Sequence, residues 1–255
     1  MDSALDVLAS AITFVAVWYA LSPADGEHRF GHGKSEGLAA MLQSLVITIS
    51  ALFVCYEAVQ RLIDPQPLQQ INTGVAVMLG SALATLFLLT FQRFVVKRTG
   101  SVAIAADAMH YKSDLLVNLS VAIALPLSVW TNLPIIDPVI GVLIAAYIMW
   151  GTWEIANSSL KILLDHEIPQ SDRDNIRAIA LSHSDVKGFH DLRTRSAGST
   201  LFLQFHLELE PDISLLKSHH IMDEVEDSVR EQYPNCEIIV HADPIGIAEH
   251  RDAFD

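Results

Sequence analysis

The chain has 255 residues, of which 51% are hydrophobic, and its mean hydropathy is +0.35. This composition is too apolar for an ordinary soluble domain. The formal net charge of −14 argues against nucleic acid as a partner and favours cations.

The charge changes abruptly along the chain. Residues 1–164 hold 8 Lys and Arg against 11 Asp and Glu, whereas residues 165–255 hold 8 against 19, together with eight of the 11 histidines. We therefore predict a membrane domain over 1–164 and an acidic, soluble domain over 165–255. The two cysteines, Cys55 and Cys236, fall in different domains, which fits a reducing compartment and no disulfide framework.

Apolar stretches in the first domain are close to the roughly 20 residues that a membrane helix needs. They predict five helices, at about 2–21, 37–62, 71–96, 101–130 and 135–163. Lys and Arg concentrate in the first and third connecting loops, which places these loops and the C-terminal domain in the cytoplasm.

The second domain reads as an α+β fold. Residues 170–183 predict a helix with Ser171 as its N-cap, and 214–233 predict an amphipathic helix. Between them, two strands flank the turn signal Ala197-Gly198-Ser199, and 236–244 predict a last strand. The second strand alternates strictly, with His206 on its polar face, as expected of a half-buried strand.

Ionisable residues stand inside two of the membrane helices, where a charge costs several kcal/mol. Asp2 and Asp6 are four residues apart, as are His110 and Asp114, so each pair shares a helix face. Three carboxylates and one imidazole can close a four-coordinate site for a borderline divalent ion such as Zn²⁺. The alternative is a solvated N-terminus together with an interfacial pair near Lys112.

A second set of ligands lies in the first loop. Asp25, His28 and His32 have the spacing Asp-x-x-His-x-x-x-His among glycines that let the backbone bend around an ion. The alternative is a pair of ordinary polar loop histidines.

A third set lies on the strands of the soluble domain. His190, His206, His241 and Asp243 can form a binuclear site with a bridging carboxylate, which His219 or His220 can approach from the helix. His219 continues the face of that helix formed by Leu215 and Met222, whereas His220 lies nearer its acidic face. Scattered surface histidines are the alternative.

Several chemistries lack their sequence signatures. The chain has no His-Glu-x-x-His, no Gly-x-Ser-x-Gly and no phosphate-binding loop, so we expect no enzyme activity and no ATP-driven pump. Any transport is then expected to use an ion gradient.

Taken together, the segments DSALD, PADGEHRFGHGKSE, ADAMHYKSDLLVN, HDLRTR, FHLELE and VHADP resemble the cation diffusion facilitator family, in its branch of bacterial divalent-metal exporters. The resemblance implies a membrane helical bundle followed by a metallochaperone-like cytoplasmic domain. It assigns Asp2, Asp6, His110 and Asp114 to a central transport site, and Asp25, His28 and His32 to a loop site at the cytoplasmic mouth. It assigns His190, His206, His219, His241 and Asp243 to a cytoplasmic binuclear site, and pairs Lys34 with Asp165 where the two domains meet.

The family resemblance also implies a function. Its members are homodimers in the cytoplasmic membrane that export Zn²⁺ or Cd²⁺, with Fe²⁺ also a substrate, in exchange for protons. Zinc is then both substrate and regulatory ligand, and the imidazole of His110 is the natural proton carrier. The family has six membrane helices, and we expect five of them here, without the first. The rival hypothesis is a truncated, membrane-anchored protein that binds metal without moving it.

Overall fold

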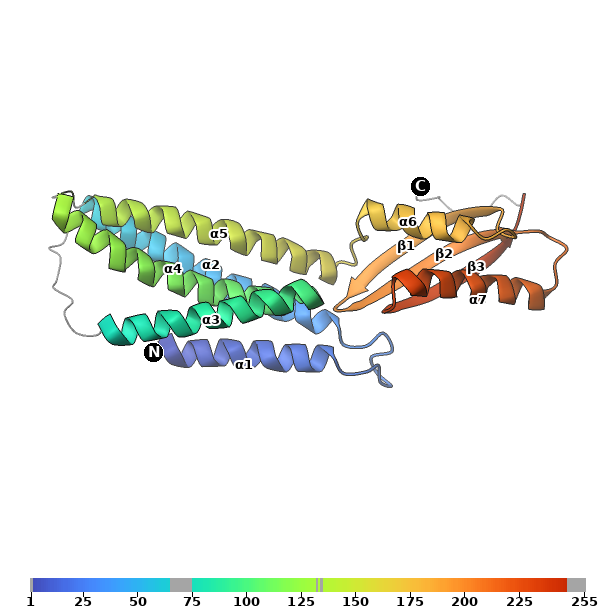
Figure 1. Ribbon diagram of the computed structural model, residues 1–255, viewed down its shortest axis with the longest axis horizontal. Coiled ribbons are helices and arrows are strands. Elements are labelled where there is room, and N and C mark those ends of the chain that lie inside the picture. Colours follow the sequence, from blue (N-terminus) through green and yellow to red (C-terminus); the bar gives the residue numbers. More distant parts are fainter. Residues whose placement is uncertain (1, 65–74, 132, 134, 247–255) are drawn as a thin grey trace. The chain divides into compact units, whose positions relative to one another are not determined.

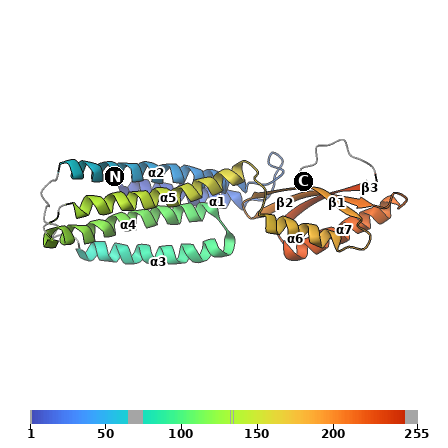
Figure 2. The ribbon, with the colours of Figure 1, turned by 90° about the horizontal axis from the view of Figure 1, so that it is seen from above.

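The computed structural model describes residues 2–64, 75–131, 133 and 135–246. It divides into two compact units, residues 1–160 and 161–255. The long helices of the first unit run side by side (Figures 1 and 2). They are α1 (Asp2–Ala20), α2 (Lys34–Ile63), α3 (Val75–Thr99), α4 (Val102–Thr131) and α5 (Ile136–Leu163). These are the five helices that the apolar stretches predict, although residues 71–74 of the predicted third helix lie outside the described part.

Helix α4 is central to the packing of the first unit, because it contacts α1, α2 and α3. A small buried cluster joins three helices through Ile47 and Ala51 of α2, Met109 of α4 and Ile148 of α5. Many large apolar side chains point outward instead, among them Phe14, Phe87, Trp150 and Trp153, each more than 70% exposed. An apolar surface of this extent is a surface for lipid or another protein rather than for water.

Two helices within the described residues, α2 and α5, are long and apolar enough by length and composition to cross a membrane. A shorter apolar segment spans 9–20 in α1. Helix α4 has a more polar first half, since it contains Asp107, His110, Lys112 and Asp114. Its ionisable residues therefore need partners within the protein.

The junction between α3 and α4 is tight. Gly100 has a positive φ of 68°, and its N–H donates to the carbonyl of Val96 at 2.8 Å, which ends α3. The next residue, Ser101, accepts the N–H of Ile104 on its Oγ at 3.3 Å and so caps α4. Ser101 Oγ also donates to Oε1 of the buried Glu36 in α2 at 3.0 Å. This bond fixes the start of α4 against the start of α2.

The second unit contains a three-stranded sheet with two helices on one face (Figure 2). Its elements are α6 (Gln170–Leu181), β1 (Gly188–Ala197), β2 (Thr200–Leu209), α7 (Leu215–Gln232) and β3 (Cys236–Pro244). The central strand β2 pairs antiparallel with β1 and parallel with β3. Gly198 has a φ of 61° in the β1–β2 turn, where the sequence predicts a hairpin.

Alternation along β2 builds the core of this unit. Leu203, Phe205, Leu207 and Leu209 are buried against Ile176 and Ala180 of α6 and Ile221, Val225 and Val229 of α7. The opposite face is less exposed than the alternation predicts, because His206 is only 2% exposed. The sheet face that carries the histidines is therefore partly buried.

The predicted N-cap Ser171 is wrong. Helix α6 begins at Gln170, and the cap position is Pro169, which makes no side-chain capping bond. The Pro169 carbonyl accepts the N–H groups of Asp172 and Arg173 at 3.0 and 3.2 Å, so the backbone already closes the first turn. Ser171 is thus inside the helix, and its hydroxyl is not needed as a cap.

Residues 165–255 are predicted to fold when expressed alone, because the core of the second unit lies within them. Phe205→Ala is expected to lower the free energy of unfolding by about 3–5 kcal/mol, since Phe205 is fully buried. The matched control Leu215→Ala removes a side chain that is 85% exposed, and its effect is expected to stay within about 0.5 kcal/mol. Urea unfolding followed by circular dichroism measures both. A segment without a cooperative transition would contradict the prediction.

Candidate metal sites

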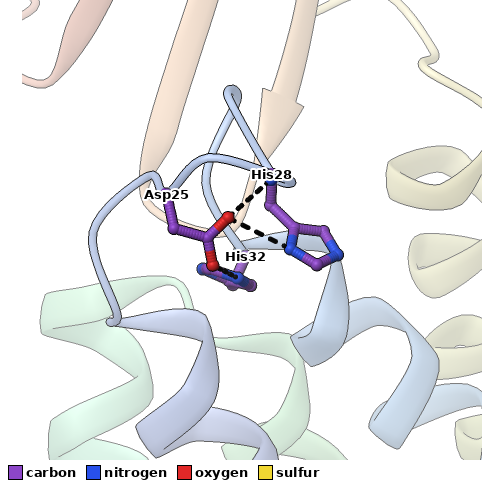
Figure 3. A group of neighbouring side chains, drawn as sticks. All are labelled: Asp25, His28 and His32. Carbon is purple, nitrogen blue, oxygen red and sulfur yellow. Dashed lines mark hydrogen bonds and ion pairs between the residues drawn. The ribbon is translucent and has the colours of Figure 1, made fainter.

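The loop between α1 and α2 brings its three predicted ligands together (Figure 3). Asp25 Oδ1 lies 3.4 Å from Nδ1 of His28, and Asp25 Oδ2 lies 3.3 Å from Nε2 of His32. Each residue offers one ligand atom, and these atoms all lie within 4.8 Å of one another. A small cation placed among them can contact all three side chains.

The backbone of this loop prepares Asp25 for a cation. Its Oδ1 accepts the N–H groups of His28 at 2.6 Å and of Glu27 at 2.9 Å. These donors lower the pKa of the Asp25 carboxyl below the ordinary aspartate value. The side chain therefore stays ionised, and available to a cation, at a lower pH than an ordinary aspartate.

The most informative atom of the loop is Nε2 of His32. This ring is buried, packs against Tyr19 with ring centroids 4.2 Å apart, and directs Nε2 toward Asp25. Among the described residues, Nε2 is a buried nitrogen without a hydrogen-bond partner. Buried polar atoms are seldom left so, and a cation held between His32 and Asp25 would satisfy it.

Half of the predicted central site lies within the described side chains. His110 is 8% exposed, and its Nε2 is 3.6 Å from Oδ2 of Asp114 one turn later on α4. The predicted ligands Asp2 and Asp6 are on α1, which packs against α4, but their side chains lie outside the described residues. The imidazole and carboxylate on α4 thus share a face, as their spacing predicts.

A polar network ties α1 to α4 close to His110. Ser10, one turn after Asp6, has its Oγ 2.8 Å from Oη of Tyr111 and 3.5 Å from Oδ1 of Asp107. Oδ2 of Asp107 accepts the amide of Gln92 on α3 at 2.6 Å. These contacts turn the face of α1 that carries Ser10 toward α4 near His110.

Sequence reasoning overlooked Asp107, although it stands three residues before His110 on the same helix face. The signal was available, because an aspartate in a membrane helix requires a partner. Its partners could not be found from sequence, since Gln92 and Ser10 come from other helices.

The cytoplasmic cluster is aligned by the sheet register. His190 on β1, His206 on β2 and His241 on β3 are direct cross-strand partners in one row. Asp243 faces all three. Its Oδ2 lies 3.5 Å from His190 Nε2 and 2.7 Å from His206 Nδ1, and its Oδ1 lies 3.1 Å from His241 Nε2.

The two oxygens of Asp243 therefore face different histidines, as a bridging carboxylate would. Three of these residues, His190, His206 and Asp243, bring one ligand atom each within 4.8 Å of the others. His219 lies elsewhere on α7, with Nε2 3.5 Å from Asp223 and a side chain that is 62% exposed. The face that His219 shares with Leu215 is exposed, because the buried positions of α7 are Ser218, Ile221, Val225 and Val229.

Comparison with known proteins matches both domains of the chain. The cation efflux transmembrane domain matches residues 1–164, and the cytoplasmic domain of cation efflux proteins matches 168–245. The chain belongs to the cation efflux, or cation diffusion facilitator, family. The cation-efflux pumps FieF of Klebsiella pneumoniae and of Salmonella newport are each 40% identical to it over 247 residues, which is 97% of this chain and 82% of theirs.

Solved structures resemble part of the chain. The zinc form of CzrB is 30% identical and covers 34% of this chain and 99% of its own, with a TM-score of 0.32. The metal-bound C-terminal domain of the CzcD transporter from Thermotoga maritima is 20% identical and covers 32% of this chain and 100% of its own, with a TM-score of 0.30.

Family membership confirms the main expectations from sequence. The chain is a metal-cation transporter with a helical transmembrane domain in the cytoplasmic membrane, followed by an α+β cytoplasmic domain. Because the second family model describes a dimerising domain, it supports the predicted dimer. The two ligand clusters within the described residues likewise support divalent-metal binding.

Asp25→Asn is predicted to weaken Zn²⁺ binding at the loop by at least about tenfold, because the variant removes the only carboxylate facing both His28 and His32 among the described side chains. The control Glu27→Gln removes an exposed carboxylate of the same loop and is expected to leave affinity unchanged. Calorimetric titration of the detergent-solubilised chain measures both. Equal affinities in the two variants would show that Asp25 is not a ligand.

Proposed function

We propose that this chain exports Zn²⁺ or Cd²⁺, with Fe²⁺ as a further substrate, from the cytoplasm in exchange for protons. The observation that carries the proposal is the buried His110 facing Asp114 on α4, a helix of the transmembrane domain. A buried imidazole beside a half-exposed carboxylate in a membrane helix is costly without a counter-charge, and a divalent cation or protons supply one.

In the proposed cycle, the metal cation and protons compete for the same site and occupy it in turn. A metal ion takes the imidazole nitrogen only when that nitrogen carries no proton. In the proposed cycle the cation enters from the cytoplasm, binds Asp2, Asp6, His110 and Asp114, and leaves outward. A proton then occupies His110 during the return, because imidazole is the side chain that ordinarily titrates near neutral pH.

The choice of metal is proposed from the ligand set. Three carboxylates offer hard oxygens, whereas the single imidazole nitrogen favours borderline and softer ions such as Zn²⁺ and Cd²⁺. The loop ligands Asp25, His28 and His32 combine imidazole with carboxylate in the same way and would deliver the cation to the central site. The cytoplasmic cluster of His190, His206, His241 and Asp243 is proposed to hold zinc as a regulatory ligand of the homodimer.

Flux measurements separate an exporter from the rival hypothesis, a membrane-anchored protein that binds metal without moving it. Proteoliposomes containing the chain are expected to accumulate Zn²⁺ inside when the interior is acidic and to lose this uptake when the pH gradient is removed. Binding without accumulation would support the rival. Accumulation that does not depend on the pH gradient would contradict proton exchange.

The variant His110→Asp is predicted to reduce the preference for Zn²⁺ over Mn²⁺ at least about tenfold and to move the pH dependence of uptake downward. An all-carboxylate site suits harder ions, and a carboxyl ordinarily titrates near pH 4 rather than 6.5. The matched control is His166→Asp, which changes an exposed histidine whose Nδ1 lies 2.7 Å from the Glu167 carbonyl. If selectivity and pH profile of His110→Asp both equal the parent's, His110 is not the selecting ligand.

A further inference from the structure

The imidazole of His206 lies between two carboxylates. Its Nδ1 is 2.7 Å from Oδ2 of Asp243, within the proposed cytoplasmic metal cluster. Its other nitrogen, Nε2, is 3.7 Å from Oδ2 of Asp191, a residue that is only 7% exposed. The Nε2 atom of this buried ring therefore faces a second buried carboxylate, that of Asp191. The proposed function gives this carboxylate no role.

Asp191 reaches His206 because β1 is irregular at this point. Neighbouring residues of a regular strand point to opposite faces of the sheet. The register of β1 against β2 shifts between His190 and Arg193, and Asp191 has a positive φ of 49°. As a result His190 and Asp191 both approach His206, with the His190 ring centroid 5.1 Å away.

This backbone conformation is unfavourable for any residue with a Cβ, although aspartate tolerates it better than most. A strained residue at a β-bulge is often one that aims a side chain at a functional site. The strain here places a carboxylate against Nε2 of a buried histidine, an arrangement that suits metal binding better than it suits strand pairing.

Arg193 holds the Asp191 carboxylate in place. Its Nε donates to Oδ1 and its Nη2 to Oδ2, both at 3.0 Å. Such a two-point contact fixes the plane of the carboxylate as well as its position. Asp191 is thus held on one side by Arg193 and faces His206 on the other.

We propose that Asp191 is a positioning residue for the cytoplasmic metal cluster. It keeps the proton of His206 on Nε2, so that Nδ1 carries no proton and can bind a divalent cation beside Asp243. Histidines that bind metals commonly place their second nitrogen against a carboxylate, which orients the ring and raises its basicity. This inference rests on the proposed function, since it requires that the cluster binds metal.

The test uses the full chain in detergent with His28→Ala, His32→Ala and His110→Ala, so that the cytoplasmic cluster dominates Zn²⁺ binding. In this background Asp191→Gly is expected to weaken Zn²⁺ binding about 10–100-fold. Its thermal stability without metal should not fall, because glycine adopts a positive φ without steric cost. Asp191→Asn keeps a neutral acceptor in a tolerated conformation and should lie between parent and glycine variant in affinity.

Chelator-competition titration gives the Zn²⁺ affinity, and a thermal melt in chelator gives the stability of the metal-free chain. The control Asp212→Gly changes an exposed aspartate of the same domain and should leave both unchanged. An Asp191→Gly variant with the parent's Zn²⁺ affinity would overturn the proposal. So would a lowered metal-free melting temperature with unchanged affinity, which indicates a purely structural role.

The variant His206→Ala separates a failure of the metal cluster itself from a failure of the role proposed for Asp191. If it leaves Zn²⁺ affinity unchanged, the cytoplasmic metal cluster itself is refuted. If it abolishes high-affinity binding while Asp191→Gly does not weaken it, the cluster stands and only the role of Asp191 fails.

Discussion

A buried imidazole and a carboxylate on adjacent turns of a membrane helix are the constraint on which the rest of this structure depends. His110 and Asp114 lie on α4, which packs against three other helices. Ionisable groups in a membrane helix are costly unless opposite charge is supplied, and in the proposed function a transported cation supplies it only while it is bound. In the proposed exchange, protons on the ligands replace the charge of the cation when the site holds no metal.

The network around Asp107 shows how the bundle holds such a site. Ser10 of α1 and Gln92 of α3 both contact the buried carboxylate of Asp107 on α4, and Tyr111 of α4 holds Ser10 in turn. Because polar contacts between membrane helices fix their rotation as well as their spacing, this network sets which face of α1 meets α4. The ion pair of Arg61 with Asp137, at 3.0 Å, joins α2 to α5 in the same manner.

The cytoplasmic domain carries its proposed ligands on a sheet instead of on helices. Its proposed metal ligands lie on three adjacent strands, so the sheet register alone aligns His190, His206 and His241. The apolar face of the same strand β2 packs against both helices, which makes the ligand row as rigid as the core behind it. Rigid alignment suits a site that binds a cation and keeps it, whereas transport requires a site that can release it.

Much of this was predictable from sequence because the signals are local. Apolar length gives the five helices, alternation gives β2, and spacing gives the pairs on α4 and the triad of the loop. Contacts that depend on tertiary structure could not be read in this way. The burial of His206, the irregular strand that turns Asp191 toward it, and the exposure of His219 all arise from packing and register, which leave no periodic signature in the sequence.

Zinc K-edge X-ray absorption on the full chain in lipid nanodiscs tests the central claim most directly. The chain would carry His28→Ala, His32→Ala and His206→Ala, so that the bound Zn²⁺ reports on α1 and α4. The account predicts a four-coordinate nitrogen and oxygen shell with one imidazole at about 2.0–2.1 Å, and loss of that imidazole signal in His110→Ala. A zinc shell without imidazole, or one that His110→Ala leaves unchanged, would contradict the account.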